Sequence, residues 1–249
     1  YPKRPLLPPS WRMMICIPSS ITEVEKRAVR DSAEQAGAKE VYLIHEPMAA
    51  ALGIGIDVEE PVGNMIIDIG GGTTGITVIA LAGIVCDQSI RIAGDEFTAD
   101  IMEALRRYHS LLIGERTAEQ IKIQVGAAMK DIDNPPDDFP VNGRDLVTGI
   151  PKQIMVSYQE IAEALDKSVF KIEEAILKAL EQTPPELAAD IYRRGLYITG
   201  GGALLRGLDR RLSAKIKLPV HVADDPLKSV VRGTGIALKN YDRYPFVMR

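Results

Sequence analysis

The chain has 249 residues, of which 46% are hydrophobic and 26% charged, and its formal net charge is −4 at pH 7. This is the balance of a globular protein with one large or two small domains, and it gives no general electrostatic reason to bind nucleic acid. The sequence contains neither an apolar run of about 18 residues nor a signal peptide, so we expect no membrane span and no cleaved leader. Cys16 and Cys86 lie in apolar, strand-like runs, which predicts buried thiols in a reducing cytosol, and the three histidines have no metal-ligand spacing.

The N-terminal quarter alternates strands and helices after an extended start. Residues 1–10 are rich in proline and basic side chains, which predicts an extended arm. Thr22 and Glu25 form a capping-box pattern, and Gly37 marks the end of the helix that they open. The predicted elements are strands over 13–17 and 41–44 and helices over 22–36 and 46–53.

Three consecutive strands follow, over 64–69, 74–81 and 84–92. The next segment, 95–109, has helical periodicity, and its expected buried face contains Phe97, Ile101, Leu105 and Tyr108. The region 110–156 is less regular. It predicts a helix over 117–129, a loop over 131–140, and strands around 142–143 and before Val156.

The last third begins with a long helix, for which Ser157 and Glu160 give the capping pattern and Pro184 gives the stop. The remaining pattern alternates again. It predicts strands over 196–199 and 219–222 and helices over 203–214 and 229–240.

A glycine-rich turn lies between the first two of the three consecutive strands. The buried strand 64–69 carries Asp68 near its end and runs into Gly70, Gly71 and Gly72. Glycines let backbone N–H groups approach an anion closely, and Asp68 could hold the water shell of a Mg²⁺ ion that accompanies phosphates. The spacing fits neither the Walker A nor the Rossmann pattern. It therefore predicts a phosphate-binding turn between antiparallel strands.

A second glycine triplet, Gly200 to Gly202, follows the predicted strand 196–199. Because a helix is expected to begin at Ala203, the N–H groups of this turn would lie at a helix N-terminus, which favours anions. A single triplet is more often an ordinary tight turn. Two triplets, each directly after a buried strand, favour phosphate binding.

The chain also contains an internal repeat. The order strand, helix, strand, acid-proline, helix runs over 13–56 and again over 196–238. Glu46-Pro47 leads to Gly53-Ile54-Gly55-Ile56 in the first copy, and Asp225-Pro226 leads to Gly233-Thr234-Gly235-Ile236 in the second. Only the second copy is preceded by three strands and a phosphate turn, so we expect an equivalent unit to precede Tyr1 in the parent protein.

Two related α/β units with phosphate turns resemble the actin-type ATPase fold, a duplicated ribonuclease H-like fold shared by actins, sugar kinases and DnaK-type chaperones. Several strings, in order and from about Arg12 to Leu238, resemble the MreB-type bacterial actins more closely. These strings are IPS at 17–19, EPMAAA at 46–51, DIGGGTT at 68–74, GERTAEQIK at 114–122, EQTPPELA at 181–188, TGGGALLR at 199–206 and DPL at 225–227.

The resemblance implies a domain organisation in which the first actin-like domain is incomplete. Residues 1–56 would be its C-terminal part, with 223–249 packing back on it. Residues 57–110 and 157–222 would form the second domain, which carries the phosphate hairpin, and 111–156 would be a small inserted subdomain.

The resemblance also assigns roles within an ATP/ADP and Mg²⁺ site. Asp68 would hold metal-bound water, while Glu46 and Thr73 would orient the attacking water as catalytic residues. Glu119 and Lys122 would reach the ribose and adenine, although such a pair can also be a solvated intrahelical contact. Asp225 is as readily a helix start as a ligand. The full set assigned to the nucleotide is Asp68, Gly70, Gly71, Gly72, Thr73, Thr74, Glu119, Lys122, Gly200, Gly201, Gly202 and Ala203.

The function implied is that of an ATP-dependent cytoskeletal filament protein that maintains rod shape by organising cell-wall synthesis. Slow hydrolysis coupled to polymerisation is expected of the complete protein, and negligible hydrolysis of this chain alone. Its partners would be further copies of itself, the inner face of the cell membrane and membrane proteins of cell-wall elongation. The alternatives are a sugar or acetate kinase and a chaperone nucleotide-binding domain. Leu6, Leu7 and Trp11, with cationic neighbours, form a candidate membrane anchor, or an arm that packs on its own domain.

Overall fold

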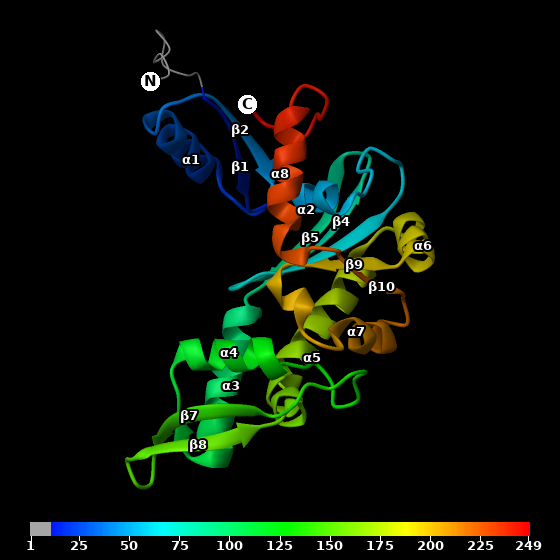
Figure 1. Cartoon of the computed structure of the whole chain (residues 1–249). Helices are drawn as coiled ribbons and strands as arrows, with labels where there is room; N and C mark the ends of the chain where they lie inside the picture. The colour runs from blue at the N-terminus through cyan, green and yellow to red at the C-terminus, as the bar shows by residue number, and fades with distance from the viewer. Residues whose placement is uncertain (1–10) are drawn as a thin grey trace.

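The first sheet consists of two parallel strands, β1 (Trp11–Ile17) and β2 (Ala38–His45), joined by α1 (Glu23–Gln35). The computed structural model describes residues 11–249 (Figure 1). The predicted capping box is confirmed, because the Thr22 hydroxyl accepts from the Glu25 N–H and the Glu25 carboxylate accepts from the Thr22 N–H. The C-terminal segment returns to this sheet, where Leu43 and Met248 exchange two backbone hydrogen bonds of 2.9 and 3.0 Å.

The second sheet has five strands in the order β10-β9-β3-β4-β5. Its antiparallel part is the predicted run of three strands, and β9 and β10 add to it in parallel. The bounds are β3 (Asn64–Ile69), β4 (Thr74–Ala80), β5 (Gly83–Ile90), β9 (Leu196–Thr199) and β10 (Val220–Val222). Because β3 and β9 are parallel neighbours, the β3–β4 turn and the C-terminal end of β9 lie side by side at the same end of the strands.

Helices and a small third sheet extend from the five-stranded sheet (Figure 1). The third sheet has the order β6-β7-β8 and lies at the far end of α3. Its buried residues, including Val141 and Val156, belong to the same apolar core as the five-stranded sheet, so 111–156 is continuous with that core. The domain boundaries stay a prediction. The bounds are α3 (Gly94–His109), β6 (Leu111–Leu112), α4 (Glu115–Val125), β7 (Phe139–Asp145), β8 (Pro151–Val156), α5 (Tyr158–Gln182) and α6 (Pro185–Arg194).

The closing helices of the internal repeat, α2 (Glu46–Ile54) and α8 (Ser229–Lys239), cross in direct backbone contact. A Cβ atom at Gly53 would overlap the Ser229 carbonyl oxygen, and one at Gly233 would overlap the Ala49 carbonyl oxygen. Glycine is therefore required at both positions by the close approach. The repeated glycines bring the two copies of the repeat together.

Three expectations about the elements are wrong. The helix predicted from Ala203 begins later, because a 3-10 turn, η1 (Gly201–Leu204), and a left-handed Gly207 come before α7 (Leu208–Ile216). The helix predicted to reach residue 129 ends at Val125, beyond which the backbone pairs with the 206 region instead. Tyr108 is 53% exposed and does not share the buried face of α3. Its ring instead lies beside the Arg107 guanidinium.

Within residues 11–249, no helix is both long and apolar enough to cross a membrane.

Candidate functional site

A cavity of about 700 Å³ lies between the two glycine turns. Its walls come from the β3–β4 turn, the start of α3, the middle of α4, the Gly200–Gly202 turn and the segment η2 (Pro226–Lys228) that leads into α8. The predicted residues that line it are Asp68, Gly70, Gly71, Glu119, Lys122, Gly200, Gly201 and Gly202. The structure thus brings five separate parts of the sequence to one site, and the predicted residues come from three of them.

The β3–β4 turn is held so that its N–H groups remain available. The Gly70 N–H donates to the Thr73 carbonyl at 3.0 Å, and the N–H groups of Gly94 and Asp95 donate to the carbonyls of Gly70 and Gly71 at 3.1 and 2.8 Å. Among residues 11–249, nothing accepts a hydrogen bond from the N–H groups of 71–73. Successive unpaired N–H groups in a turn form an anion-binding concavity.

The second turn packs directly against the first. Gly200 has φ +79°, and a Cβ there would overlap the Asp68 carboxylate and the Ile69 carbonyl oxygen. A Cβ at Gly202 would overlap the Ile69 side chain. The expected helix N-terminus is missing here, because Gly201 and Gly202 begin a 3-10 turn that is too short to act as an anion site of that kind. Their role is therefore close backbone approach.

Asp68 lies at the mouth of β3 as a partly buried acid without a hydrogen-bond partner in the described part of the chain. Burial and, to a smaller extent, the nearby Glu46 charge together raise the pKa of its carboxyl to about 6. A cation would stabilise such a carboxylate. Because residues 11–249 contain no cluster of three or more metal-ligating side chains, a Mg²⁺ ion here would depend on water and phosphate oxygens for its other ligands.

The two residues predicted to act on water, Glu46 and Thr73, are not among the residues that line the cavity. Glu46 is the first residue of α2, and partial burial raises its pKa. Its charge contributes to the pKa of Asp68, which places the two carboxylates near each other. Thr73 is exposed at the end of the β3–β4 turn. Neither side chain lines the cavity, so their catalytic role stays a prediction.

Two other predicted ligands are turned away from the cavity. Thr74 is fully buried, and its hydroxyl donates to the Ile92 carbonyl at 2.6 Å. Ala203 is buried beneath the second glycine turn. Any contact of either residue with a nucleotide would therefore have to come from its backbone.

Glu119 and Lys122 form more than a solvated helical pair. The Lys122 Nζ lies 2.6 Å from the Glu119 carboxylate and donates to the Gly94 carbonyl at 2.8 Å and to the Thr98 hydroxyl at 3.2 Å. The Lys122 side chain is only 15% exposed. Both residues line the cavity, but the ammonium group of Lys122 is already engaged by the protein.

Asp225 is a structural helix-start residue in this arrangement. Its carboxylate contacts Lys228 at 3.1 Å and Arg232 at 3.6 Å, and it does not line the cavity. The alternative ligand role is therefore disfavoured.

The sequence patterns missed the start of α3 and the apolar wall of the cavity. The N–H groups of Gly94 and Asp95 hold the β3–β4 turn, and the Gly-Asp dipeptide that follows β5 after three residues was the available signal. The apolar wall has no sequence pattern of its own, because its members come from α3, α4, η1, η2 and α8. The missed residues are Gly94, Asp95, Phe97, Ile123, Leu204, Leu205, Pro226, Leu227 and Val230.

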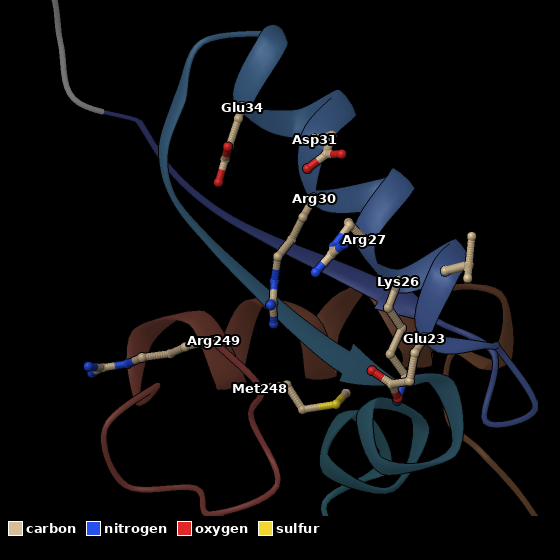
Figure 2. A pocket seen from close by; sticks show the side chains of 9 residues that line it. Glu23, Lys26, Arg27, Arg30, Asp31, Glu34, Met248 and Arg249 are labelled. Atoms are coloured by element: carbon tan, nitrogen blue, oxygen red, sulfur yellow. The ribbon is translucent and has the colours of Figure 1, made fainter.

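A second cavity, of about 690 Å³, lies between α1 and the C-terminal segment (Figure 2). Acidic and basic side chains of α1 alternate along it, and Glu23 and Lys26 neutralise each other at 2.8 Å. It has no glycine turn and no convergent set of like charges. The cavity between the glycine turns is therefore the better ligand site.

The candidate membrane anchor is only partly described. Leu6 and Leu7 lie outside the described residues, whereas Trp11 begins β1 and is 63% exposed. The exposed indole is compatible with an anchor but leaves the hypothesis open.

Comparison with known proteins places this site in a family. The family model described as MreB/Mbl protein matches residues 4–245. The cell shape-determining protein Mbl of Bacillus subtilis is 49% identical over 234 residues, which are 94% of this chain and 70% of that protein. The cell shape-determining protein MreB of Escherichia coli is 49% identical over 239 residues, covering 95% and 67%.

Solved structures agree with these relatives. MreB5 of Spiroplasma citri, crystallised with AMPPNP and with ADP, is 39% identical and superposes with TM-scores of 0.89 and 0.88. The match covers 93% and 92% of this chain and 69% and 70% of the MreB5 chains. The predicted actin-like α/β fold is confirmed. The family model matches nearly the whole length of this chain, and the fold and the paired glycine turns agree with that match. This chain therefore belongs to the MreB/Mbl family.

Proposed function

We propose that this chain binds ATP and ADP between its two glycine turns. The observation that carries the proposal is the row of unpaired N–H groups at 71–73, in a turn whose Gly70 and Gly71 line a cavity of about 700 Å³ together with Asp68. These donors suit phosphate oxygens, and the apolar wall formed by Ile123, Leu204 and Leu227 suits a base. The nucleotides present in the MreB5 crystals support the same assignment.

A Mg²⁺ ion fits the proposed site, because the partly buried Asp68 carboxylate has no partner in the described residues. Asp68 would hold water molecules of the ion, which when bound would neutralise charge on the phosphates. Glu46, activated by its raised pKa, would accept or align a proton of the attacking water, and Thr73 would help to orient that water. Hydrolysis would be slow and would time the state of a polymer.

We propose that the full-length protein assembles into actin-like filaments that determine cell shape. The support is family membership, because the curated relatives are named cell shape-determining proteins. A kinase or a chaperone domain of the same fold is not favoured by these comparisons. The filaments would lie at the cytoplasmic face of the cell membrane and organise cell-wall synthesis together with membrane proteins of cell-wall elongation.

Sedimentation of the full-length protein tests the filament. With ATP and Mg²⁺ we expect a pellet of polymer, with little pellet in the absence of nucleotide. Asp68→Asn should reduce the pellet, whereas a matched change in the second cavity, Asp31→Asn, should not. A stable monomer with sugar-stimulated turnover would instead support a kinase.

The membrane contact is proposed for Leu6, Leu7 and Trp11, which could enter the headgroup boundary next to cationic side chains. One short anchor binds weakly, so filament avidity is required. We expect Leu6→Ser combined with Leu7→Ser to leave polymerisation intact but to reduce co-flotation of filaments with anionic liposomes. Unchanged flotation would exclude this arm as the anchor.

A further inference from the structure

Two hydroxyl groups from different sheets bind the same carboxylate. Ser19, just beyond the end of β1, donates to Asp87 Oδ2 at 2.5 Å, and Thr77 of β4 donates to Asp87 Oδ1 at 2.8 Å. Asp87 lies on β5, so its carboxylate joins the first sheet to the five-stranded sheet. We call Ser19, Asp87 and Thr77 the clasp. None of the three lines the nucleotide cavity.

Strand alternation places the clasp on the same face of the five-stranded sheet as Asp68. Within β3, Ile66 packs in the apolar cluster of the first sheet, whereas its neighbours on either side pack in the other core. Asp68, two residues after Ile66, shares its face. Thr77 lies opposite Ile66 and Asp87 lies opposite Thr77, and opposite residues of an antiparallel pair share a face. The clasp and Asp68 therefore lie on the face directed toward the first sheet.

On the other side of this contact, the clasp holds the strand next to Glu46. Ile17, at the end of β1, pairs with His45, and Glu46 follows His45 as the first residue of α2. Ser19 lies two residues beyond Ile17. Helix α2 lies between the first sheet and the five-stranded sheet, and its apolar side chains share one cluster with those of β3 (Figure 1). The clasp thus fastens the contact that brings Glu46 near Asp68.

We propose that Ser19, Asp87 and Thr77 are positioning residues for ATP hydrolysis, which hold Glu46 in place relative to Asp68 and so set the turnover rate rather than the nucleotide affinity. The inference rests on the proposed function of Glu46 as the acceptor of a proton from the attacking water. Small displacements of such a group lower the rate strongly, because the reacting atoms must be aligned.

Steady-state hydrolysis by the full-length protein tests the clasp. For Asp87→Ala we expect kcat to fall about tenfold while ATP affinity, measured by calorimetry, changes by less than about twofold. Ser19→Ala should lower kcat in the same direction. Combining it with Asp87→Ala should cause no further loss, because both substitutions break the same contact.

Conservative variants separate hydrogen bonding from charge. Ser19→Thr keeps the hydroxyl, and Asp87→Asn keeps an acceptor and gains a donor, so both should retain most of the turnover. Gln88→Ala is the matched control. Gln88 is the next residue on β5 but lies on the opposite face, where its amide donates to Gln182 of α5 at 2.6 Å. Its substitution should leave turnover unchanged.

Equal turnover in Asp87→Ala and Gln88→Ala would overturn the proposal. A loss of ATP affinity without a fall in kcat would overturn it as well. Turnover in Asp87→Asn as low as in Asp87→Ala would show that the charge of Asp87 matters rather than the contact, which also contradicts the proposal.

Amide hydrogen exchange without nucleotide separates this inference from the proposed function. We expect faster exchange at 19–21 in Asp87→Ala than in Gln88→Ala, and equal exchange would contradict the clasp. If the unmodified protein did not hydrolyse ATP, the catalytic role proposed for Glu46 would be disproved. Exchange at 19–21 would still show whether the clasp holds the two sheets together.

Discussion

The two acid-proline pairs of the internal repeat occupy equivalent places but different electrostatic environments. Asp225 precedes α8 and is held by Lys228 and Arg232, both of which follow it in the chain. Glu46 begins α2, is followed by apolar small residues, and has no ion pair within residues 11–249. Instead its pKa is raised by burial, and its charge acts on Asp68. Sequence repetition therefore preserved the helix start, while the surrounding charges distinguish a structural acid from a candidate functional acid.

The helices that follow the two acids are alike where they touch each other. Gly53 and Gly233 make the backbone crossing, whereas Gly235, two residues later, has no atom within 4 Å of an added Cβ. The close approach itself is thus symmetric between the two copies of the repeat. What differs is the chemistry at the N-terminal end of each helix.

The largest effect is expected at this crossing. Gly53→Ala would place a methyl group on the Ser229 carbonyl, which cannot move without separating the two helices, and should lower the free energy of unfolding by about 3 kcal/mol or more. Gly235→Ala is the control, and its better helix propensity should raise stability by about 0.5–1 kcal/mol. Urea unfolding measures both. Equal effects would show that the crossing does not depend on backbone contact.

The next effect distinguishes the two acids directly. Glu46→Ala should lower ATP turnover by about 100-fold, because an aligned proton acceptor is lost, while ATP affinity changes little. Turnover at saturating ATP and calorimetric affinity are the measurements, with Asp225→Ala as the control at the equivalent position. Similar turnover in both variants would remove the functional distinction between the acids.

Asp68 gives a smaller effect that depends on pH. Because its pKa is raised to about 6 in the folded chain, the folded state keeps a proton that the unfolded state has already released, so stability without nucleotide and Mg²⁺ should fall as pH rises from about 4 to 6. Asp68→Asn should flatten this dependence in urea unfolding.

The same substitution should weaken Mg²⁺-dependent ATP binding by about tenfold, since a neutral amide is a poorer acceptor for metal-bound water. Binding measured in EDTA serves as the control and should change much less. A loss of equal size with and without Mg²⁺ would contradict the role assigned to Asp68.

The smallest effect is expected for the stability of Asp225→Ala. Its contacts with Lys228 and Arg232 are partly exposed, and such pairs contribute about 1 kcal/mol or less. Thermal unfolding should shift slightly, and nucleotide affinity should remain the same. A marked loss of affinity would return Asp225 to the ligand set.

Most elements could be predicted from the sequence because their signals are local. Each of these signals depends on neighbouring residues, and each predicted feature is present: the capping box of Thr22 and Glu25, the N-cap at Ser157 and the three strands before Asp95. The failed boundaries depend on distant contacts. The backbone of residues 127–128 pairs with Arg206, and Gly207 takes a left-handed conformation against Met129 and Ile132, neither of which a helical period can show.

The site was predictable to a similar extent. Asp68 and the two glycine triplets could be identified because a strand that runs into glycines is a local pattern with a chemical meaning, and the tertiary structure places them on one cavity. Thr74 and Ala203 were counted with their neighbours, but strand alternation and turn geometry direct their side chains into the core. The apolar wall was invisible because no local spacing connects its members.

The sequence by itself determined the order of most elements, the internal repeat and the two glycine turns, since strand and helix periods, caps and glycine runs act over a few residues. Only the tertiary structure decided which side chains share a charge environment. Among residues 11–249, burial and distance across the fold leave Glu46 and Asp68 without an ion pair, whereas Asp225 pairs with Lys228 and the Lys122 ammonium donates to the Gly94 carbonyl. Electrostatic energies depend on separation in space and on access to solvent, and neither quantity is written in the local sequence.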